Sequence, residues 1–185
     1  MIFPIRVIAL ILLLASLTLA PRIARAELLK TGDTAPNFSA QAIVGDQTET
    51  INLADLKGRT VVLYFYPKDF TSGCTKEACA FRDGYAKLKK AGIVLLGCSV
   101  DTADSHRGFI KQYNLPFPLL VDPNKKIADA YGVKNGIMSL GLDSRVTYVI
   151  KEGKIVSVYP KVDPALNASQ IIHDFGSAQP STAMN

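Results

Sequence analysis

The chain has 185 residues and a formal net charge of +5, from 21 lysines and arginines against 16 aspartates and glutamates. The basic residues are scattered, so the composition does not indicate a nucleic-acid-binding surface. Three cysteines are too few for a disulfide-stabilised scaffold of this size. No GxGxxG or GxxxxGK loop is present for a nucleotide, and no CxxC pair suggests a zinc or haem site. We therefore expect neither a cofactor nor a metal.

Residues 1–26 have the pattern of a signal peptide. Arg6 supplies a positive charge, residues 7–20 are an apolar run, and residues 24–26 form a small-x-small cleavage site. The apolar run is shorter than the roughly 20 residues of a spanning helix. We expect cleavage after Ala26, with an uncleaved membrane anchor as the alternative. Cleavage leaves 159 residues with a net charge of +2, which is enough for one domain with a substantial core.

The mature chain reads as a series of short strands and helices. In chain order, the pattern predicts strands at 38–43 and 48–53 joined at Gly45-Asp46, a turn at 53–58, a strand at 60–66, a helix from about 75 to 91, a strand at 93–100, a helix at 105–113, a strand at 118–121, a helix at 125–131, a hairpin of 146–151 and 154–159, and a helix at 165–175. Two strand–helix crossovers followed by a hairpin and a last helix indicate an α/β sandwich. We expect one domain at 27–175 and a polar, flexible tail at 176–185.

Cys74 has the most informative context. The strand at 60–66 is β-branched and aromatic, which is typical of a buried central strand. Thr71 or Ser72 can cap the helix that follows. Cys74 is therefore expected near the first turn of a helix, just past the carboxyl end of a strand, where ligands bind in α/β sheets. The unpaired N–H groups and partial positive charge there favour a reactive thiolate. The alternative is an inert buried thiol.

Cys79 follows Cys74 by five residues. In an intact α-helix, Cα atoms at this spacing are about 8.6 Å apart and point about 140° apart around the axis. A disulfide needs Cα atoms within about 7 Å. If the two cysteines are partners, the start of the helix has to unwind when they bond. The alternative is that they are unrelated, with Cys79 packed beneath Cys74.

Other side chains near strand ends have less specific patterns. Arg145 precedes a predicted strand, and its guanidinium can hold a thiolate or an incoming oxygen. On pattern alone, a surface charge is the favoured interpretation. Cys98, within a buried strand, is expected to fill the core. Asp101 is expected to cap the next helix, and His106 to lie on a helix face.

The motif Pro67-x-x-x-Thr71-x-x-Cys74 resembles the active-site motif of the peroxiredoxins. The position of Cys79 and the run at 80–83 resemble one branch of that family, the bacterioferritin-comigratory-protein or PrxQ type. Further segments that resemble this branch are 105–109, 115–120 and 145–150. The similarity covers about residues 29–175, nearly all of the mature chain.

The resemblance implies a thioredoxin-like fold, with three α/β/α layers around a central mixed sheet and an N-terminal β-hairpin. It also implies a thiol peroxidase without metal or haem. By similarity, Cys74 is the peroxidatic cysteine, which becomes a sulfenic acid, and Cys79 is the resolving cysteine, which condenses with it to an intramolecular disulfide. Thr71 is expected to hydrogen-bond the peroxide, Pro67 to keep water from the sulfur, and Arg145 to polarise the O–O bond.

We therefore expect an enzyme that reduces hydrogen peroxide and organic hydroperoxides with a thioredoxin-like or other thiol reductant. We expect it to be an exported monomer, in a periplasm or a thylakoid lumen, which meets a membrane only if the N-terminal segment is retained. Two alternatives share the fold. An exported thiol–disulfide oxidoreductase is expected to carry CxxC, and a copper-delivery protein CxxxC with a partner histidine, whereas this chain has C-x4-C.

Overall fold

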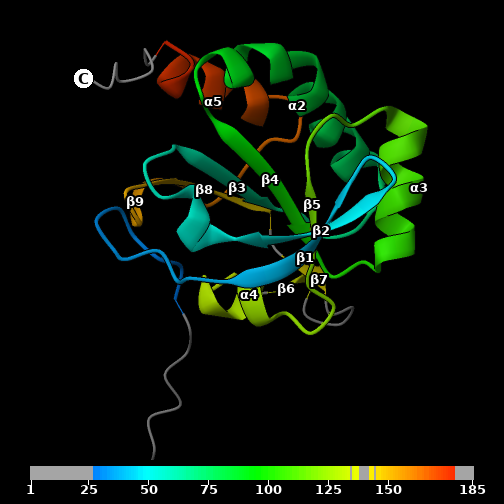
Figure 1. Ribbon diagram of the computed structural model, residues 1–185, viewed down its shortest axis with the longest axis horizontal. Helices are drawn as coiled ribbons and strands as arrows, with labels where there is room; N and C mark the ends of the chain where they lie inside the picture. Colours follow the sequence, from blue (N-terminus) through cyan, green and yellow to red (C-terminus); the bar gives the residue numbers. More distant parts are fainter. Residues whose placement is uncertain (1–26, 134, 138–141, 144, 178–185) are drawn as a thin grey trace, which may run out of the picture.

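The computed structural model describes residues 27–133, 135–137, 142–143 and 145–177 (Figure 1). Its strands are β1 (Ser39–Val44), β2 (Gln47–Asn52), β3 (Val61–Phe65), β4 (Val94–Ser99), β5 (Leu119–Val121), β6 (Asn135–Ile137), β7 (Leu142–Asp143), β8 (Val146–Lys151) and β9 (Lys154–Tyr159). Its helices are the 3-10 turn η2 (Leu53–Leu56) and the α-helices α2 (Ser72–Lys90), α3 (Ala103–Tyr113), α4 (Lys126–Ala130) and α5 (Asn167–Phe175). The predicted signal segment and residues 178–185 of the predicted tail lie outside the described residues.

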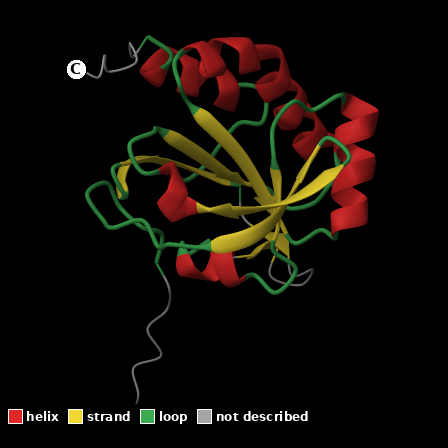
Figure 2. Cartoon of the chain, viewed as in Figure 1, coloured by secondary structure: helices red, strands yellow, loops and turns green. Residues whose placement is uncertain are grey.

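Seven strands form one mixed sheet in the order β2-β1-β5-β4-β3-β8-β9. Figure 2 shows the strands in yellow and the helices that pack around them in red. The β3–β4 and β4–β5 pairs are parallel, and they are connected through α2 and α3. The hairpins β1–β2 and β8–β9 are antiparallel, as predicted. A separate two-stranded sheet, β6–β7, was not predicted from the sequence.

Helices cover both faces of this sheet, with α2, α3 and α5 on one side and α4 on the other (Figure 1). The two faces alternate along β3. Val62 and Tyr64 belong to the cluster that includes residues of α2, α3 and α5. Val61, Leu63 and Phe65 belong to the cluster that includes residues of α4 and η2. Because β3 is buried on both faces, every position in it is apolar or aromatic. The mixed sheet between two helical layers, together with the N-terminal β1–β2 hairpin, confirms the expected three-layer, thioredoxin-like fold.

Helices α2 and α3 begin earlier than the sequence predicts, whereas α4 and α5 begin at Lys126 and Asn167, one and two residues later than predicted. Helix α2 begins at Ser72, earlier than the predicted start near residue 75, with Thr71 as its N-cap residue. Helix α3 is capped by Thr102, whose hydroxyl accepts from the Ser105 N–H at 3.3 Å. The expectation that Asp101 is this cap was therefore wrong. The burial of Cys98 in β4 is as predicted.

Candidate active site

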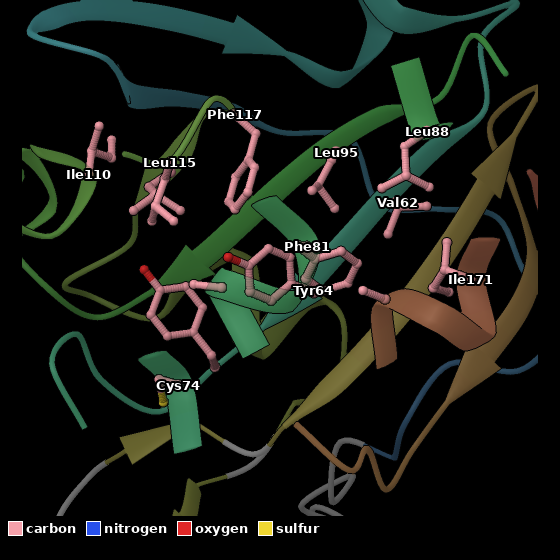
Figure 3. Close-up of a cluster of buried hydrophobic side chains, with 14 of the residues drawn as sticks. Val62, Tyr64, Cys74, Phe81, Leu88, Leu95, Ile110, Leu115, Phe117 and Ile171 are labelled. Atoms are coloured by element: carbon pink, nitrogen blue, oxygen red, sulfur yellow. The ribbon is translucent and has the colours of Figure 1, made fainter. Parts of the chain in front are cut away.

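Cys74 is the third residue of α2, close to where the chain leaves β3. The Thr71 carbonyl accepts the first helical hydrogen bond, from the Thr75 N–H at 2.9 Å. The N–H groups of Gly73 and Cys74 precede this bond and have no acceptor within the helix. Cys74 is 1% exposed and forms one end of the buried cluster that Figure 3 shows. The positive end of the helix therefore lies beside a sulfur that is largely shielded from water.

Arg145 brings a positive charge to this sulfur, with Nη2 donating to Cys74 Sγ at 3.4 Å. The antiparallel pairing of β3 and β8 sets Val146 opposite Phe65. The start of β8 therefore lies beside the carboxyl end of β3, where the loop to α2 begins. Gly73 makes room for the guanidinium, because a Cβ atom there would lie 3.2 Å from Nη2. The surface position that the pattern alone favoured for Arg145 was wrong.

Glu77 holds the same guanidinium from one helical turn further along α2. Its carboxylate accepts from Arg145 Nη1, and its Oε1 accepts from Asn167 Nδ2 at 2.8 Å. Asn167 Nδ2 also donates to Thr147 Oγ1 at 2.8 Å, and Glu77, Asn167 and Thr147 are all fully buried. Burial raises the pKa of Glu77 from 4.5 to about 7, although the Arg145 charge acts in the opposite direction. Glu77, held by Asn167, thus fixes the orientation of Arg145, and the sequence pattern indicated neither Glu77 nor Asn167.

Thr71 and Pro67 lie on the loop between β3 and α2. Thr71 is exposed, and its hydroxyl donates to the Lys68 carbonyl at 3.0 Å instead of capping the helix. Its oxygen can therefore accept a hydrogen bond from an incoming hydroxyl group. Pro67 follows the buried Tyr66 and is itself half-buried. The motif that the sequence singled out thus forms one continuous loop that leads into Cys74.

Cys79 lies in the same continuous helix and is half-buried. No disulfide joins any two of the three cysteines, all of which lie in the described ranges. Regular helical geometry separates the Cα atoms of Cys74 and Cys79 by about 8.6 Å, beyond the reach of a disulfide. A bond between them requires the first turns of α2 to unwind.

A second group of buried polar side chains lies beneath the loop. The carboxylate of Asp69, which is 3% exposed, accepts from the Tyr66 hydroxyl at 2.8 Å and the Ser105 hydroxyl at 2.7 Å, and it faces His106 Nδ1 at 2.8 Å. The Asp69 N–H donates to Asp101 Oδ2 at 2.8 Å. Asp101 thus supports the loop. His106 lies on the buried face of α3, with no exposed surface.

Elsewhere in the described residues, neither the pocket nor the grouping of polar side chains indicates a second catalytic or metal site. An open pocket of about 320 Å³ lies at the opposite edge of the sheet, between η2 and the β8–β9 turn, and its lining contains no cysteine or histidine. Within the described ranges, no three histidine, cysteine, aspartate or glutamate side chains are grouped so that they could hold a metal ion.

Comparisons with known proteins agree with the geometry. The profile of the AhpC/TSA family matches residues 31–158. A Bacillus subtilis protein named peroxiredoxin Bcp is 39% identical over 154 residues, which cover 79% of this chain and 96% of that relative. A Triticum aestivum protein named peroxiredoxin Q, chloroplastic, is 46% identical over 129 residues, which cover 69% of this chain and 58% of that relative. The crystal structure of peroxidoxin BcpB from Mycobacterium tuberculosis matches with a TM-score of 0.70 and 31% identity, covering 80% of this chain and 96% of that one.

The family match includes the loop, the cysteine helix and the strand that follows Arg145. The three comparisons together favour a peroxidase over the thiol–disulfide oxidoreductase that the sequence left as an alternative. Peroxiredoxins act on peroxides and are reduced by thioredoxin-like thiols. The chain belongs to the AhpC/TSA family, and it is a peroxiredoxin of the Bcp and Q group, a thiol-dependent peroxidase.

Proposed function

We propose that Cys74 is the peroxidatic cysteine of this peroxiredoxin and that Cys79 resolves it. The observation that carries the proposal is the contact of 3.4 Å between Arg145 Nη2 and Cys74 Sγ at the N-terminus of α2. A guanidinium cannot lose its proton at any physiological pH, so this charge is permanent. Together with the helix N-terminus, it stabilises the attacking thiolate.

In the first step, the Cys74 thiolate attacks one oxygen of the peroxide. The S–O bond forms as the O–O bond breaks, and the sulfur passes two electrons to the peroxide. The leaving hydroxide or alkoxide takes up a proton from solvent, which balances the proton that Cys74 released on ionising, and departs as water or alcohol. Arg145 and the N–H groups of Gly73 and Cys74 donate to the oxygens as charge develops on them. The Thr71 oxygen, whose own proton is directed to Lys68, accepts a hydrogen bond from the peroxide hydroxyl. Pro67, half-buried at the start of the loop, limits the access of water to the sulfur.

In the second step, α2 unwinds at its start and the Cys79 sulfur attacks the sulfenic sulfur of Cys74. The S–S bond forms, the S–O bond breaks, and the hydroxyl leaves as water with the Cys79 proton. A thiol reductant then restores both thiols by disulfide exchange. We propose that this reductant is thioredoxin-like.

The direct test compares the wild-type protein with Cys74→Ser. Loss of hydrogen peroxide and of cumene hydroperoxide is followed with dithiothreitol or thioredoxin as the reductant. We expect the wild-type protein to consume both peroxides and Cys74→Ser to consume neither, while its circular dichroism spectrum is unchanged. Peroxide consumption by Cys74→Ser would remove this residue from the mechanism.

We also propose that the protein is exported, to a periplasm or a thylakoid lumen, and acts as a monomer. Packing supports a cleavage after Ala26, because Leu28 and Leu29 already pack against a core cluster. Gly132 lets this segment approach closely, since a Cβ atom there would lie 1.9 Å from the Glu27 carbonyl oxygen. In the described part of the chain, no helix has the length and apolar character needed to cross a membrane. Intact mass after expression with an export pathway tests the cleavage, and sedimentation tests the monomer. An uncleaved mass would favour the anchor.

A further inference from the structure

The start of α2 is held in place by three side chains, whose role in the reaction rests on the proposed roles of Cys74 and Cys79. We name Asp69, Ser105 and His106 the loop anchor. Asp69 lies midway along the loop between β3 and α2, while Ser105 and His106 lie on α3. The two α3 side chains both contact Asp69 Oδ2, at 2.7 Å and 2.8 Å. The anchor therefore ties the loop to a helix that is distant from it in the sequence.

The histidine of the anchor has acceptors on both sides of its ring. Its Nε2 lies 3.1 Å from the Leu120 carbonyl oxygen, which can only accept, so Nε2 carries a hydrogen. On the other side, one proton lies between Nδ1 and Asp69 Oδ2. The Tyr66 hydroxyl, 3.5 Å from Nδ1, donates to the other oxygen of the same carboxylate. Neither the Asp69 nor the His106 side chain is exposed to solvent. The pair is therefore a buried hydrogen bond, and removal of either partner leaves a buried polar group unsatisfied.

The loop holds strain that the anchor counteracts. Phe70, between Asp69 and the N-cap residue Thr71, has a φ of +61°, which is unfavourable for a side chain of this size. Its ring rests on Phe109 of α3, with centroids 5.2 Å apart, although 46% of the residue is exposed. Such a conformation persists only where the surroundings impose it. Release of Asp69 therefore favours departure of the loop from α3 and fraying of the first turn of α2.

We propose that the Asp69–His106 pair, supported by Ser105, positions the start of α2 for reaction with peroxide and must release before Cys79 can reach Cys74. These are positioning residues, because they act through the loop and Thr71 and do not touch the sulfur. A weaker anchor raises the fraction of molecules in which the helix start is unwound. Disulfide formation then accelerates in proportion to that fraction, while the peroxide step is slowed or unchanged.

The test measures the two steps separately. The chain contains no tryptophan, so each step is followed by rapid quenching and mass spectrometry, with dimedone to trap the sulfenic acid. Ser105→Ala removes one hydrogen bond and is the mild variant. We expect it to speed disulfide formation about fivefold without speeding sulfenic acid formation. Asp69→Asn and His106→Asn are expected to speed disulfide formation by roughly tenfold or more, and their double variant to deviate from additivity.

Two substitutions serve as matched controls. Ser169→Ala removes an exposed serine that donates to the Leu166 carbonyl, and His173→Asn removes a histidine whose side chain is 88% exposed. Both should leave the two rates at wild-type values. A merely structural role for the anchor would lower the free energy of unfolding and accelerate nothing. If disulfide formation is unchanged or slower in Ser105→Ala and in whichever stronger variants fold, the inference is wrong.

The outcome also separates this inference from the proposed function. If the wild-type protein consumes no peroxide, or bonds Cys74 to a cysteine other than Cys79, the proposed function fails. If the wild-type protein forms the Cys74–Cys79 disulfide and the anchor variants form it no faster, only the present inference fails.

Discussion

The Arg145 guanidinium lies 3.4 Å from the sulfur of Cys74, although the two residues are 71 positions apart in the chain. The contact exists because β8 runs antiparallel to β3. The first residue of β8 therefore lies beside the last residue of β3, close to the start of the cysteine helix. Glu77 holds the guanidinium from behind, and Asn167 donates to the Glu77 carboxylate. The charge is thus in place before any peroxide arrives, and its position needs no reorganisation during the reaction.

Arg145→Gln is therefore expected to slow the reaction of Cys74 with hydrogen peroxide by roughly 10²–10³-fold, the loss typical of one donor to a developing negative charge. Arg145→Lys should slow this reaction less than Arg145→Gln does, because lysine keeps the positive charge. It should still be slower than wild type, because lysine lacks the planar guanidinium that contacts both Cys74 and Glu77. The measurement is the second-order rate constant from competition with another peroxidase. Arg59→Gln, an exposed arginine before β3, is the control. Equal rates for wild type and Arg145→Gln would exclude the proposed role.

Local pattern was sufficient to predict the elements around the site. The apolar run at 60–66 identified the central strand, and the change of pattern after Pro67 identified the loop and the helix. Helix α2 nevertheless begins at Ser72, because Thr71 has the extended backbone of an N-cap residue even though its hydroxyl donates to Lys68. A side chain that is able to cap a helix indicates the region where the helix can begin. The tertiary contacts of the loop determine which residue is the first of the helix.

The polar residues behind the site were beyond local pattern. Asn167 and His106 reach the site from α5 and α3, and their partners are defined only once those helices pack on the sheet. Glu77 had a usable signal, since its spacing of three from Cys74 places both on one face of a helix. The role of Arg145 came from family resemblance, because a single arginine before a strand carries no local information about its partner.

Cys79→Ser should still form a sulfenic acid at Cys74 but should fail to convert it to an intramolecular disulfide. The reason is that Cys98, the remaining cysteine, lies fully buried within β4 and cannot approach without disruption of the sheet. Dimedone labelling with mass spectrometry is the measurement. Cys98→Ala is the control and should still form the Cys74–Cys79 bond. A Cys74–Cys98 bond in the oxidised wild-type protein would contradict the pairing.

The buried carboxyl of Glu77 predicts a pH dependence of stability. Its pKa is about 7 in the folded protein against an ordinary value of 4.5, so between these values the folded state keeps a proton that the unfolded chain has lost. The free energy of unfolding therefore falls as pH rises through this window, by up to about 3 kcal/mol. Glu77→Gln lacks the ionisable group and keeps a partner for Asn167. Its stability relative to wild type should increase from pH 5 to pH 8 in urea unfolding.

The control for this prediction is Glu49→Gln, because Glu49 is exposed on β2. Its stability relative to wild type should be the same at both pH values. A parallel pH dependence in wild type and Glu77→Gln would show that the Glu77 carboxyl does not titrate within this window. The same variant is expected to slow the peroxide step, since Arg145 loses its anionic partner.

Loss of the hydroxyl group should change the free energy of unfolding differently at two buried tyrosines, Tyr64 and Tyr148. Within the described residues, the Tyr64 hydroxyl is buried without a hydrogen-bond partner, whereas the Tyr148 hydroxyl donates to the Tyr131 carbonyl at 2.7 Å. Tyr64→Phe keeps the ring that packs on Phe81, with centroids 4.7 Å apart, and removes only the unpaired group. We expect it to be neutral or to stabilise by up to about 1 kcal/mol, and Tyr148→Phe to destabilise by about 1–2 kcal/mol. Urea unfolding at one pH measures both. Equal losses in the two variants would mean that the Tyr64 hydroxyl has a partner, such as a buried water, that contributes as much as the Tyr131 carbonyl does.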